Sequence, residues 1–176
     1  MEYPKRKRLR LPDFDYTTQG AYFVTLCTQD KKHLFQIDET DKVIPEPHIA
    51  HSLQNDEISM QNRIIHHWIN EIHNKFQDVK VDKYVIMPNH IHLLLQITDK
   101  SSGNIIIGGD TPTTTIIAKL ISTFKRFSHS ELGFNIWQNR SNDHIVRDED
   151  DYLRIWQYID ENPAKWEDDC FYKDFE

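Results

Sequence analysis

Residues 81–98 read VDKYVIMPNHIHLLLQIT, two apolar runs of strand length on either side of the pair Pro88-Asn89. Short apolar runs bounded by turn residues are typical of buried strands, and proline and asparagine both favour turns. The stretch therefore predicts a β-hairpin, with one strand over 81–87 and the other over 90–98.

Similar patterns outside the hairpin predict one more long strand and three helices. Residues 20–28, GAYFVTLCT, are rich in β-branched and aromatic side chains and predict a strand. Apolar residues recur at steps of three and four, as on one face of a helix, over the ranges 58–76, 116–130 and 148–161. Residues 134–138 and 143–146 are shorter and predict an edge strand with a loop.

The last helix has clear ends. Asp148 is its expected N-cap, acidic residues fill its first turn, and Asn162-Pro163 ends it.

The order of strand, helix, strand, strand, helix, strand and helix predicts an α+β fold of the ferredoxin-like kind. In that fold an antiparallel sheet carries helices on one face.

Length and composition fit a single catalytic domain behind a basic arm. The chain has 176 residues, enough for a core without disulfides or a structural metal. Residues 1–19 are basic and lack periodicity, so they predict an arm, while 20–176 predict the domain. The sequence has neither an apolar run of membrane-spanning length nor a secretory signal pattern, and Cys27 and Cys170 lack metal-ligand spacing. We therefore expect a cytoplasmic protein with free thiols and no membrane partner.

Charge is unevenly distributed along the chain. The net charge of −7 argues mildly against nucleic acid, because phosphate contacts dominate such affinities. The acidic excess lies largely over residues 38–57 and from 148 onward, however, and separate clusters of cations could form a basic face. The basic side chains that are candidates for DNA binding are Lys5, Arg6, Lys7, Arg8, Arg10, Lys125, Arg126, Arg140 and Arg147.

A histidine pair opens the second strand of the hairpin. Side chains alternate between the faces of a strand, so His90 and His92 share one face while Ile91 points to the other. Two imidazoles side by side on a sheet are natural ligands for a metal ion. The chain has ten histidines, and a lone H-x-H pattern also occurs among surface or hydrogen-bonded histidines, so the pattern by itself leaves both interpretations open.

The last helix offers a second set of candidate side chains. At 100° per residue, its buried stripe consists of Tyr152, Ile155, Trp156 and Ile159. Tyr158 and Asn162 lie four residues apart on the flank of that stripe, so the helix could present a hydroxyl nucleophile and a neutral oxygen ligand together. The alternative is that Tyr158 is a half-buried packing residue and Asn162 only ends the helix.

Two imidazoles and an amide oxygen form a neutral donor set of borderline to hard character. Mg²⁺ or Mn²⁺ suits such a set better than structural Zn²⁺, which needs four ligands with cysteines among them. The open coordination positions would accept phosphate oxygens and neutralise developing charge. Tyr158 would then attack the phosphorus and hold it as a phosphotyrosine.

An ordered set of motifs resembles one known family. The motifs are 84–95 (YVIMPNHIHLLL), 136–138 (IWQ), 143–147 (DHIVR) and 158–163 (YIDENP), with further similar pieces at 8–12 (RLRLP), 21–27 (AYFVTLC) and 123–125 (TFK). Together they resemble the REP-associated tyrosine transposases, bacterial relatives of the single-strand insertion-sequence transposases in the HUH superfamily. The resemblance covers residues 6–172, apart from 38–56 and 99–113.

The resemblance implies roles for four residues. The family's histidine pair matches His90 and His92, its catalytic tyrosine matches Tyr158, and the polar metal ligand four positions later matches Asn162. It also implies a ferredoxin-like core, dependence on Mg²⁺ or Mn²⁺, and single-stranded DNA substrates with hairpins from repetitive palindromic elements. Cleavage would leave a 5′-phosphotyrosine and a free 3′-hydroxyl, and we expect the protein to act as a monomer or a homodimer.

Three functions follow as hypotheses. The leading one is metal-dependent nicking and strand transfer of single-stranded DNA by a tyrosine transposase. The second is a protein that binds a DNA hairpin without cutting it, although such a protein has no need of the histidine pair, the tyrosine and the asparagine together. The third is a metal-dependent nucleic-acid phosphodiesterase that uses water as its nucleophile and therefore forms no covalent adduct.

Overall fold

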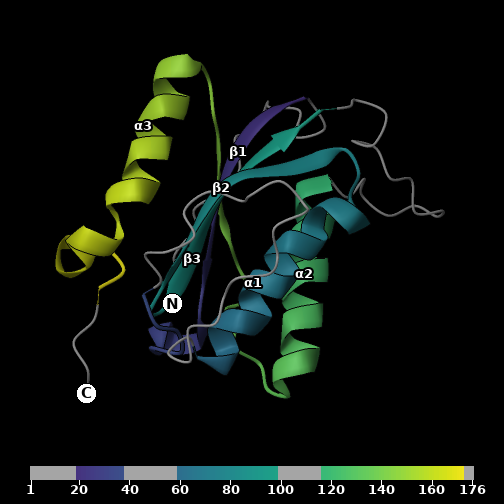
Figure 1. The fold of residues 1–176 in the computed structure, drawn as a ribbon, viewed down its shortest axis with the longest axis vertical. Coiled ribbons are helices and arrows are strands. Elements are labelled where there is room, and N and C mark those ends of the chain that lie inside the picture. Colours follow the sequence, from purple (N-terminus) through teal and green to yellow (C-terminus); the bar gives the residue numbers. More distant parts are fainter. Residues whose placement is uncertain (1–18, 38–58, 99–115, 173–176) are drawn as a thin grey trace, which may run out of the picture.

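The computed structural model describes residues 19–37, 59–98 and 116–172 (Figure 1). The strands are β1 (Gly20–Cys27), β2 (Val79–Met87), β3 (His90–Ile97) and β4 (Asn142–Ile145). The helices are α1 (Met60–Lys75), α2 (Ile116–Leu132) and α3 (Glu149–Glu161), with short 3-10 helices η1 (Gln29–Lys31) and η2 (Pro163–Asp168). The arm expected over 1–19 lies, except for Gln19, outside these residues, and so do the ranges 38–56 and 99–113, which the family resemblance does not cover.

The four strands form one antiparallel sheet in the order β2-β3-β1-β4. The hairpin is confirmed: β2 pairs with β3, with Met87 opposite His90 across the Pro88-Asn89 turn. β1 lies between β3 and β4, and the end of β1 at Cys27 is opposite His90. With α1 and α2 as crossovers, this is the expected ferredoxin-like order, and it places β3 and its histidines in the middle of the sheet.

One face of the sheet packs against α1 and α2. Alternate residues of the strands point to this face, and the apolar stripes of both helices cover them, as the helical periodicity predicted. The buried side chains include Tyr22, Val24, Leu26, Ile65, Ile69, Ile91, Leu93, Leu95, Leu120 and Phe124. Because β-branched and leucine side chains fill both layers, this core fixes the register of β3 and hence the face on which His90 and His92 lie.

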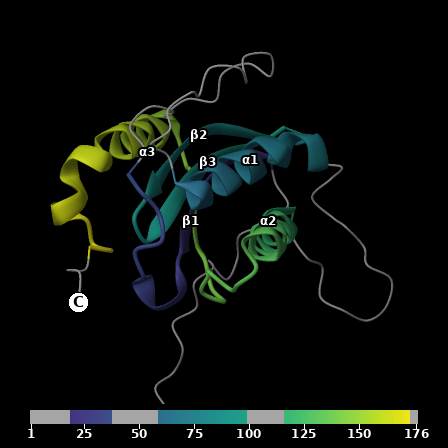
Figure 2. The same ribbon diagram turned by 60° about the horizontal axis from the view of Figure 1, so that its bottom comes forward.

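The other face of the sheet packs against α3, which the sequence analysis did not anticipate. On this face the strands contribute a smaller apolar cluster of Ala21, Val85, Met87 and Leu94. Ile155 and Ile159 of α3 pack against it. Figures 1 and 2 place α3 across the sheet from α2. The α+β class is therefore confirmed, but the expectation of helices on one face only is corrected: the last helix covers the face that carries the histidine pair.

The start of α3 is fixed by hydrogen bonds. Asp148 is its N-cap, as predicted, and its carboxylate accepts the backbone N–H of Asp151 at 2.8 Å. The buried carboxylate of Asp151 in turn accepts from the backbone N–H of Arg147 at 3.1 Å and bonds to Nε2 of His144, on β4, at 2.8 Å. These bonds tie the first turn of the helix to the edge strand.

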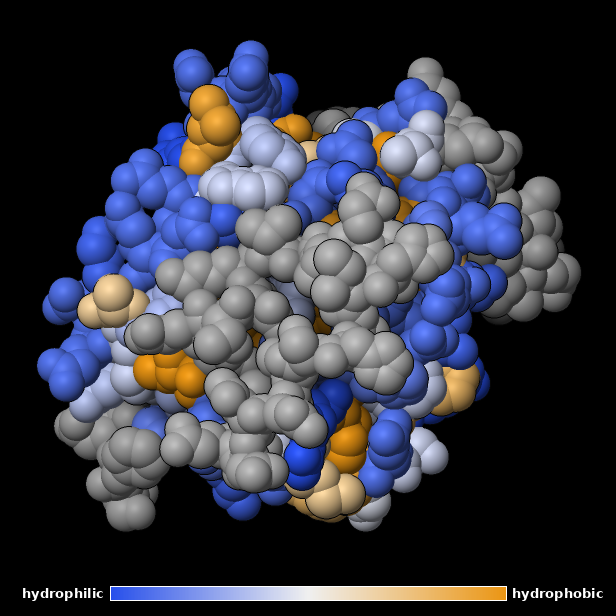
Figure 3. Space-filling model, in the orientation of Figure 1, coloured by the Kyte–Doolittle hydropathy of each residue, from blue (hydrophilic) through white to orange (hydrophobic). Residues whose placement is uncertain are grey.

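The face of the molecule drawn in Figure 3 is mainly hydrophilic where its residues are described, and the hydrophobic side chains there form separate small patches. Among the described residues, no helix is both long enough and apolar enough to cross a membrane. Both cysteines, Cys27 and Cys170, are free thiols, as expected.

Candidate active site

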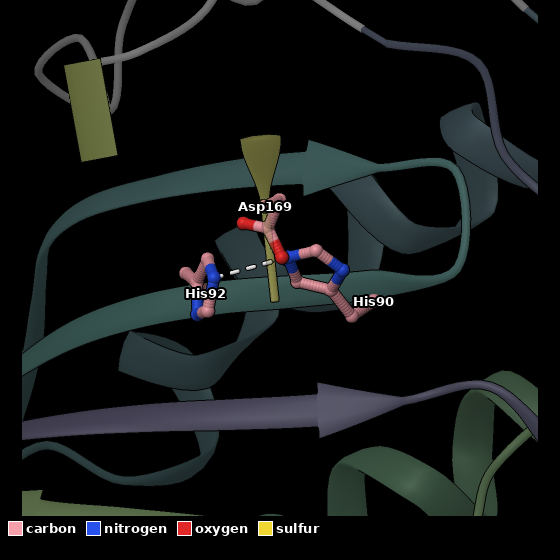
Figure 4. Close-up of side chains that lie close together, drawn as sticks. All are labelled: His90, His92 and Asp169. Atoms are coloured by element: carbon pink, nitrogen blue, oxygen red, sulfur yellow. Dashed lines mark hydrogen bonds between the residues drawn. The ribbon is translucent and has the colours of Figure 1, made fainter. Parts of the chain in front are cut away.

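His90 and His92 lie side by side on one face of β3, as strand alternation predicted (Figure 4). This is the face that α3 covers. Both are buried, and their Nε2 atoms are 3.0 Å apart. The ring of Phe23, from the neighbouring strand β1, stacks on His92 with its centroid at 4.9 Å. The two imidazoles thus meet at one point and are shielded from water, which favours their neutral, metal-binding forms.

A further hydrogen bond orients each imidazole. Asn89 donates from Nδ2 to the carbonyl of Phe171 at 2.8 Å, so its Oδ1 accepts from Nδ1 of His90 at 2.9 Å. With the proton on Nδ1, the neutral His90 ring has an unprotonated Nε2, whose lone pair can accept a hydrogen bond or bind a metal ion. Nδ1 of His92 lies 2.9 Å from the hydroxyl of Thr25, which can donate or accept and therefore permits either tautomer of His92. Asn89 and Thr25 are the kind of supporting partners that orient metal-binding histidines.

The last helix brings Tyr158 and Asn162 to the same point. The hydroxyl of Tyr158 lies 3.3 Å from Nε2 of His92, and 37% of this residue remains exposed. Asn162, one turn later, is only 3% exposed. The predicted flank is confirmed: Ile155 and Ile159 face the core, the Tyr158 hydroxyl turns toward His92, and the Asn162 amide bonds to Asp169, which lies beside the histidines.

Asp169 is a member of the site that sequence analysis missed. It follows η2, and its carboxylate points at the histidine pair (Figure 4). Ligand atoms of His90, His92 and Asp169 all lie within 4.8 Å of one another, so this group could hold a metal ion. The Oδ2 atom of Asp169 also accepts from the hydroxyl of Tyr158 at 3.2 Å and from Nδ2 of Asn162 at 2.9 Å.

The donor atoms fit a divalent cation in two respects. An octahedral ion with ligands at about 2.1 Å places neighbouring ligand atoms about 3 Å apart, which matches the 3.0 Å between Nε2 of His90 and Nε2 of His92. Oδ1 of Asn162 is buried and has no hydrogen-bond partner among the described residues. A buried carbonyl oxygen without a partner is costly unless it binds something, and a cation bound within its reach would satisfy it.

Burial and charge shift the pKa values in the site. Burial lowers the pKa of His90 to about 4 and that of His92 well below its usual 6.5, so both rings are neutral at pH 7 and free to bind a cation. Burial and then the charge of Asp169 raise the pKa of Tyr158 above its usual value of 10.0. Positive charge from a bound divalent cation would oppose the effect of Asp169 and favour ionisation of the phenol.

The low histidine pKa values should make the free energy of unfolding depend on pH when metal has been removed with a chelator. Below pH 6.5 the unfolded chain protonates both imidazoles, whereas folded His90 stays neutral until about pH 4. We therefore expect the free energy of unfolding to fall over this window, by up to about 1.4 kcal/mol per pH unit for each histidine. Urea unfolding at pH 7, 6 and 5 measures this slope. In a His92→Gln variant the free energy of unfolding should change less with pH. An equal change in both proteins would contradict a lowered pKa for His92.

The candidate DNA-binding side chains fall in different places. Lys125 and Arg126 lie on α2, on the face of the sheet opposite to the histidines. The ammonium of Lys125 donates to the carbonyls of Gln138 and Arg140, at 2.6 and 3.1 Å, so it braces that segment. Arg140 and Arg147 are exposed on either side of β4. Lys5, Arg6, Lys7, Arg8 and Arg10 lie outside the described residues.

Comparison with known proteins finds relatives of this chain in sequence. No family model matches it. A protein of Haemophilus influenzae without assigned function is 32% identical over 183 residues, which cover 96% of this chain and 94% of that protein. A second H. influenzae protein, named as a candidate REP-associated tyrosine transposase, is 26% identical over 153 residues, covering 86% of this chain and 74% of that protein.

A solved structure shares the fold. The structure of a REP-associated tyrosine transposase bound to a REP hairpin superposes with a TM-score of 0.56 at 19% identity, over 84% of this chain and 68% of that one. The shared fold and the second relative together support a transposase-like function. The chain therefore has a transposase-like fold, and its sequence is similar to that of a candidate REP-associated tyrosine transposase.

Proposed function

We propose that this protein nicks single-stranded DNA and transfers the cut strand through a covalent bond to Tyr158. The observation that carries the proposal is the position of the Tyr158 hydroxyl, 3.3 Å from His92 Nε2, which itself lies 3.0 Å from His90 Nε2. A nucleophilic oxygen beside two neutral imidazoles can attack a phosphate whose charge is neutralised at the same point.

Tyr158 forms and later releases the covalent intermediate. Tyr158 gives up its phenolic proton as its oxygen attacks the phosphorus of a phosphodiester. The bond from phosphorus to the 3′ oxygen of the preceding nucleotide breaks, and that oxygen takes up a proton and leaves as a 3′-hydroxyl. The 5′-phosphate remains esterified to Tyr158. In strand transfer another 3′-hydroxyl gives up its proton and attacks the same phosphorus, and the phenol oxygen of Tyr158 leaves and is reprotonated.

The residues that would hold the metal are His90, His92 and Asn162, with Asp169 as an additional carboxylate donor. When bound, Mg²⁺ or Mn²⁺ supplies positive charge that polarises the phosphodiester and stabilises the charge that develops on it. Phe23 packs its ring edge against Tyr158 with the centroids 6.0 Å apart, which restricts the phenol to the side of the histidines. The protein's own part is thus to orient the nucleophile and its neighbours.

The proposed substrate is single-stranded DNA that carries a hairpin. The solved structural neighbour is bound to a REP hairpin, and the sequence motifs resemble that family. One experiment separates this function from a hairpin-binding protein and from a hydrolase that uses water. A hairpin oligonucleotide, labelled on the 3′ side of the cleavage site, is incubated with protein and Mn²⁺ and run on a denaturing gel.

The proposed function predicts label that migrates with the denatured protein. Cleaved label without any adduct would support water as the nucleophile, and uncleaved label that is retarded only on a native gel would support a binding protein. Either of these two results contradicts the proposal.

Replacement of Asn162 should weaken metal binding more than folding. We expect Asn162→Ala to lower metal affinity about 10- to 100-fold, a range typical for loss of a supporting metal contact, so that cleavage is impaired at low Mn²⁺ and partly restored in excess. The measurement is the cleavage rate as a function of Mn²⁺ concentration. Gln157→Ala, an exposed amide on the same helix, is the matched control. Absence of any rescue would assign Asn162 a structural role at the helix end.

The basic arm is proposed to add DNA affinity and no chemistry. Five cations within residues 5–10 would contact phosphates and release counterions. Deletion of residues 1–10 should therefore flatten the plot of log affinity against log salt by about 0.7 per lost contact on single-stranded DNA. The cleavage rate at saturating DNA should stay unchanged. An identical salt slope with and without the arm would show that the arm does not touch DNA.

A further inference from the structure

A β-bulge in β2 turns two consecutive residues toward α3. The pairing of β2 with β3 shifts between Val81 and Lys83, which lie opposite Leu95 and Leu94. Val81 and Tyr84 both point into the core under α1 and α2. The extra residue in β2 therefore lets Asp82 and Lys83 both face the other side, whereas regular alternation would send them to opposite faces.

Both bulge residues bind α3 directly. The carboxylate of Asp82 accepts from the hydroxyl of Tyr152 at 3.0 Å. The ammonium of Lys83 donates to Oδ2 of Asp160 at 2.6 Å and lies 4.0 Å from the centre of the Trp156 ring. These three residues of α3 are spaced four apart, so the contacts run along about two turns of the helix.

These contacts lie on the opposite flank of α3 from the nucleophile. In the structure only Ile155 and Ile159 of the expected stripe are fully packed in the core, and Tyr152 and Trp156 are partly buried beside them. At 100° per residue, Tyr152, Trp156 and Asp160 lie on one side of these isoleucines and Tyr158 lies on the other. Hydrogen bonds of Asp151 hold the first turn of α3. Along the later turns, the apolar contacts of Ile155 and Ile159 are non-directional and would by themselves leave the helix able to roll about its axis. A roll of about 20° would move side chains that lie about 5.5 Å from the axis by about 2 Å. That shift would separate Tyr158 from His92.

Stability alone does not account for Lys83. Its side chain is 2% exposed, whereas that of Asp160 is 40% exposed. Taking an ammonium out of water is unfavourable, and apolar side chains of similar volume often stabilise a fold at least as well as a buried ion pair. The ion pair does, however, have a defined direction, which a methionine at this position would lack.

We propose that Asp82 and Lys83 are positioning residues that set the roll of α3 and so hold the Tyr158 hydroxyl beside His92. This inference rests on the proposed function of Tyr158. The bulge residues touch neither the histidines nor the nucleophile in any contact found among the described residues, and they act through the helix. A displacement of about 1 Å at a reacting atom can lower a rate about 100-fold.

The test compares Lys83→Met with Lys119→Met, an exposed lysine of α2 on the other side of the sheet. Lys83→Met should lower the single-turnover cleavage rate at saturating hairpin and Mn²⁺ by about 10-fold or more. The dissociation constant for the hairpin should stay unchanged, and the thermal midpoint should stay the same or rise. Lys119→Met should match the parent protein throughout. A Lys83→Met rate within twofold of the parent would overturn the proposal.

A crystal structure of Lys83→Met gives a readout that does not depend on activity. The distance from the Tyr158 hydroxyl to Nε2 of His92, 3.3 Å in the parent, should lengthen by 1 Å or more, and an unchanged distance would overturn the proposal. If the parent protein forms no covalent adduct, the proposed function fails, and this distance alone decides the positioning role. Should Lys83→Met not fold, Asp160→Asn, which removes the charge of the half-exposed partner, is subjected to the same two measurements.

Discussion

Tyr158→Phe is expected to abolish the covalent adduct and to lower strand cleavage about 10⁴-fold or more, because it removes the oxygen that we propose to attack phosphorus. Folding and hairpin affinity should change little, since the residue is 37% exposed and its ring stays in place. The measurements are the single-turnover cleavage rate and the hairpin dissociation constant.

Tyr84→Phe is the matched control for this variant. Its hydroxyl is buried against Nδ1 of His66, at 2.8 Å, on the face of the sheet away from the histidine pair. The variant should lose about 1 kcal/mol of stability from the broken hydrogen bond and should still form the adduct. Cleavage by Tyr158→Phe at a rate near that of the parent would show that another group is the nucleophile.

His92→Gln is expected to have the second largest effect. His92 contacts both His90 and Tyr158 through Nε2, so its loss removes a proposed metal ligand and the neighbour of the proposed nucleophile together. We expect cleavage to fall about 100- to 1,000-fold or more, the range for loss of one preorganised electrostatic group. Mn²⁺ binding, followed by calorimetry, should weaken in parallel.

His129→Gln is the control for loss of a histidine. This side chain is exposed near the end of α2, on the opposite side of the sheet, and its replacement should leave Mn²⁺ affinity and cleavage unchanged. Parent-like Mn²⁺ affinity in His92→Gln would contradict the placement of the metal at the histidine pair.

Local patterns predicted most of what positions the site. The Pro88-Asn89 turn and the alternation along β3 correctly placed His90 and His92 on one face, because strand period and turn chemistry act over a few residues. Helical periodicity likewise placed Tyr158 and Asn162 on one flank of α3. Each of these features depends on neighbouring residues alone.

Long-range contacts explain what could not be predicted. Asp169 reaches the site because Asn89 binds the carbonyl of Phe171 at 2.8 Å and folds the chain back after η2, a contact that leaves no periodic signal. The face that α3 covers was also missed. Alternate apolar residues such as Val85, Met87 and Leu94 on the histidine face were the available signal, since a sheet with two apolar faces needs a cover on each.

The most direct test of the account is to identify the residue that carries DNA after cleavage. The protein is incubated with Mn²⁺ and a hairpin oligonucleotide, the DNA is trimmed with nuclease, and the proteolytic peptides are analysed by mass spectrometry. The account predicts a nucleotide attached through its 5′-phosphate to the peptide that contains Tyr158, and to its phenol oxygen. A nucleotide on any other residue, or complete cleavage without a modified peptide, would contradict it.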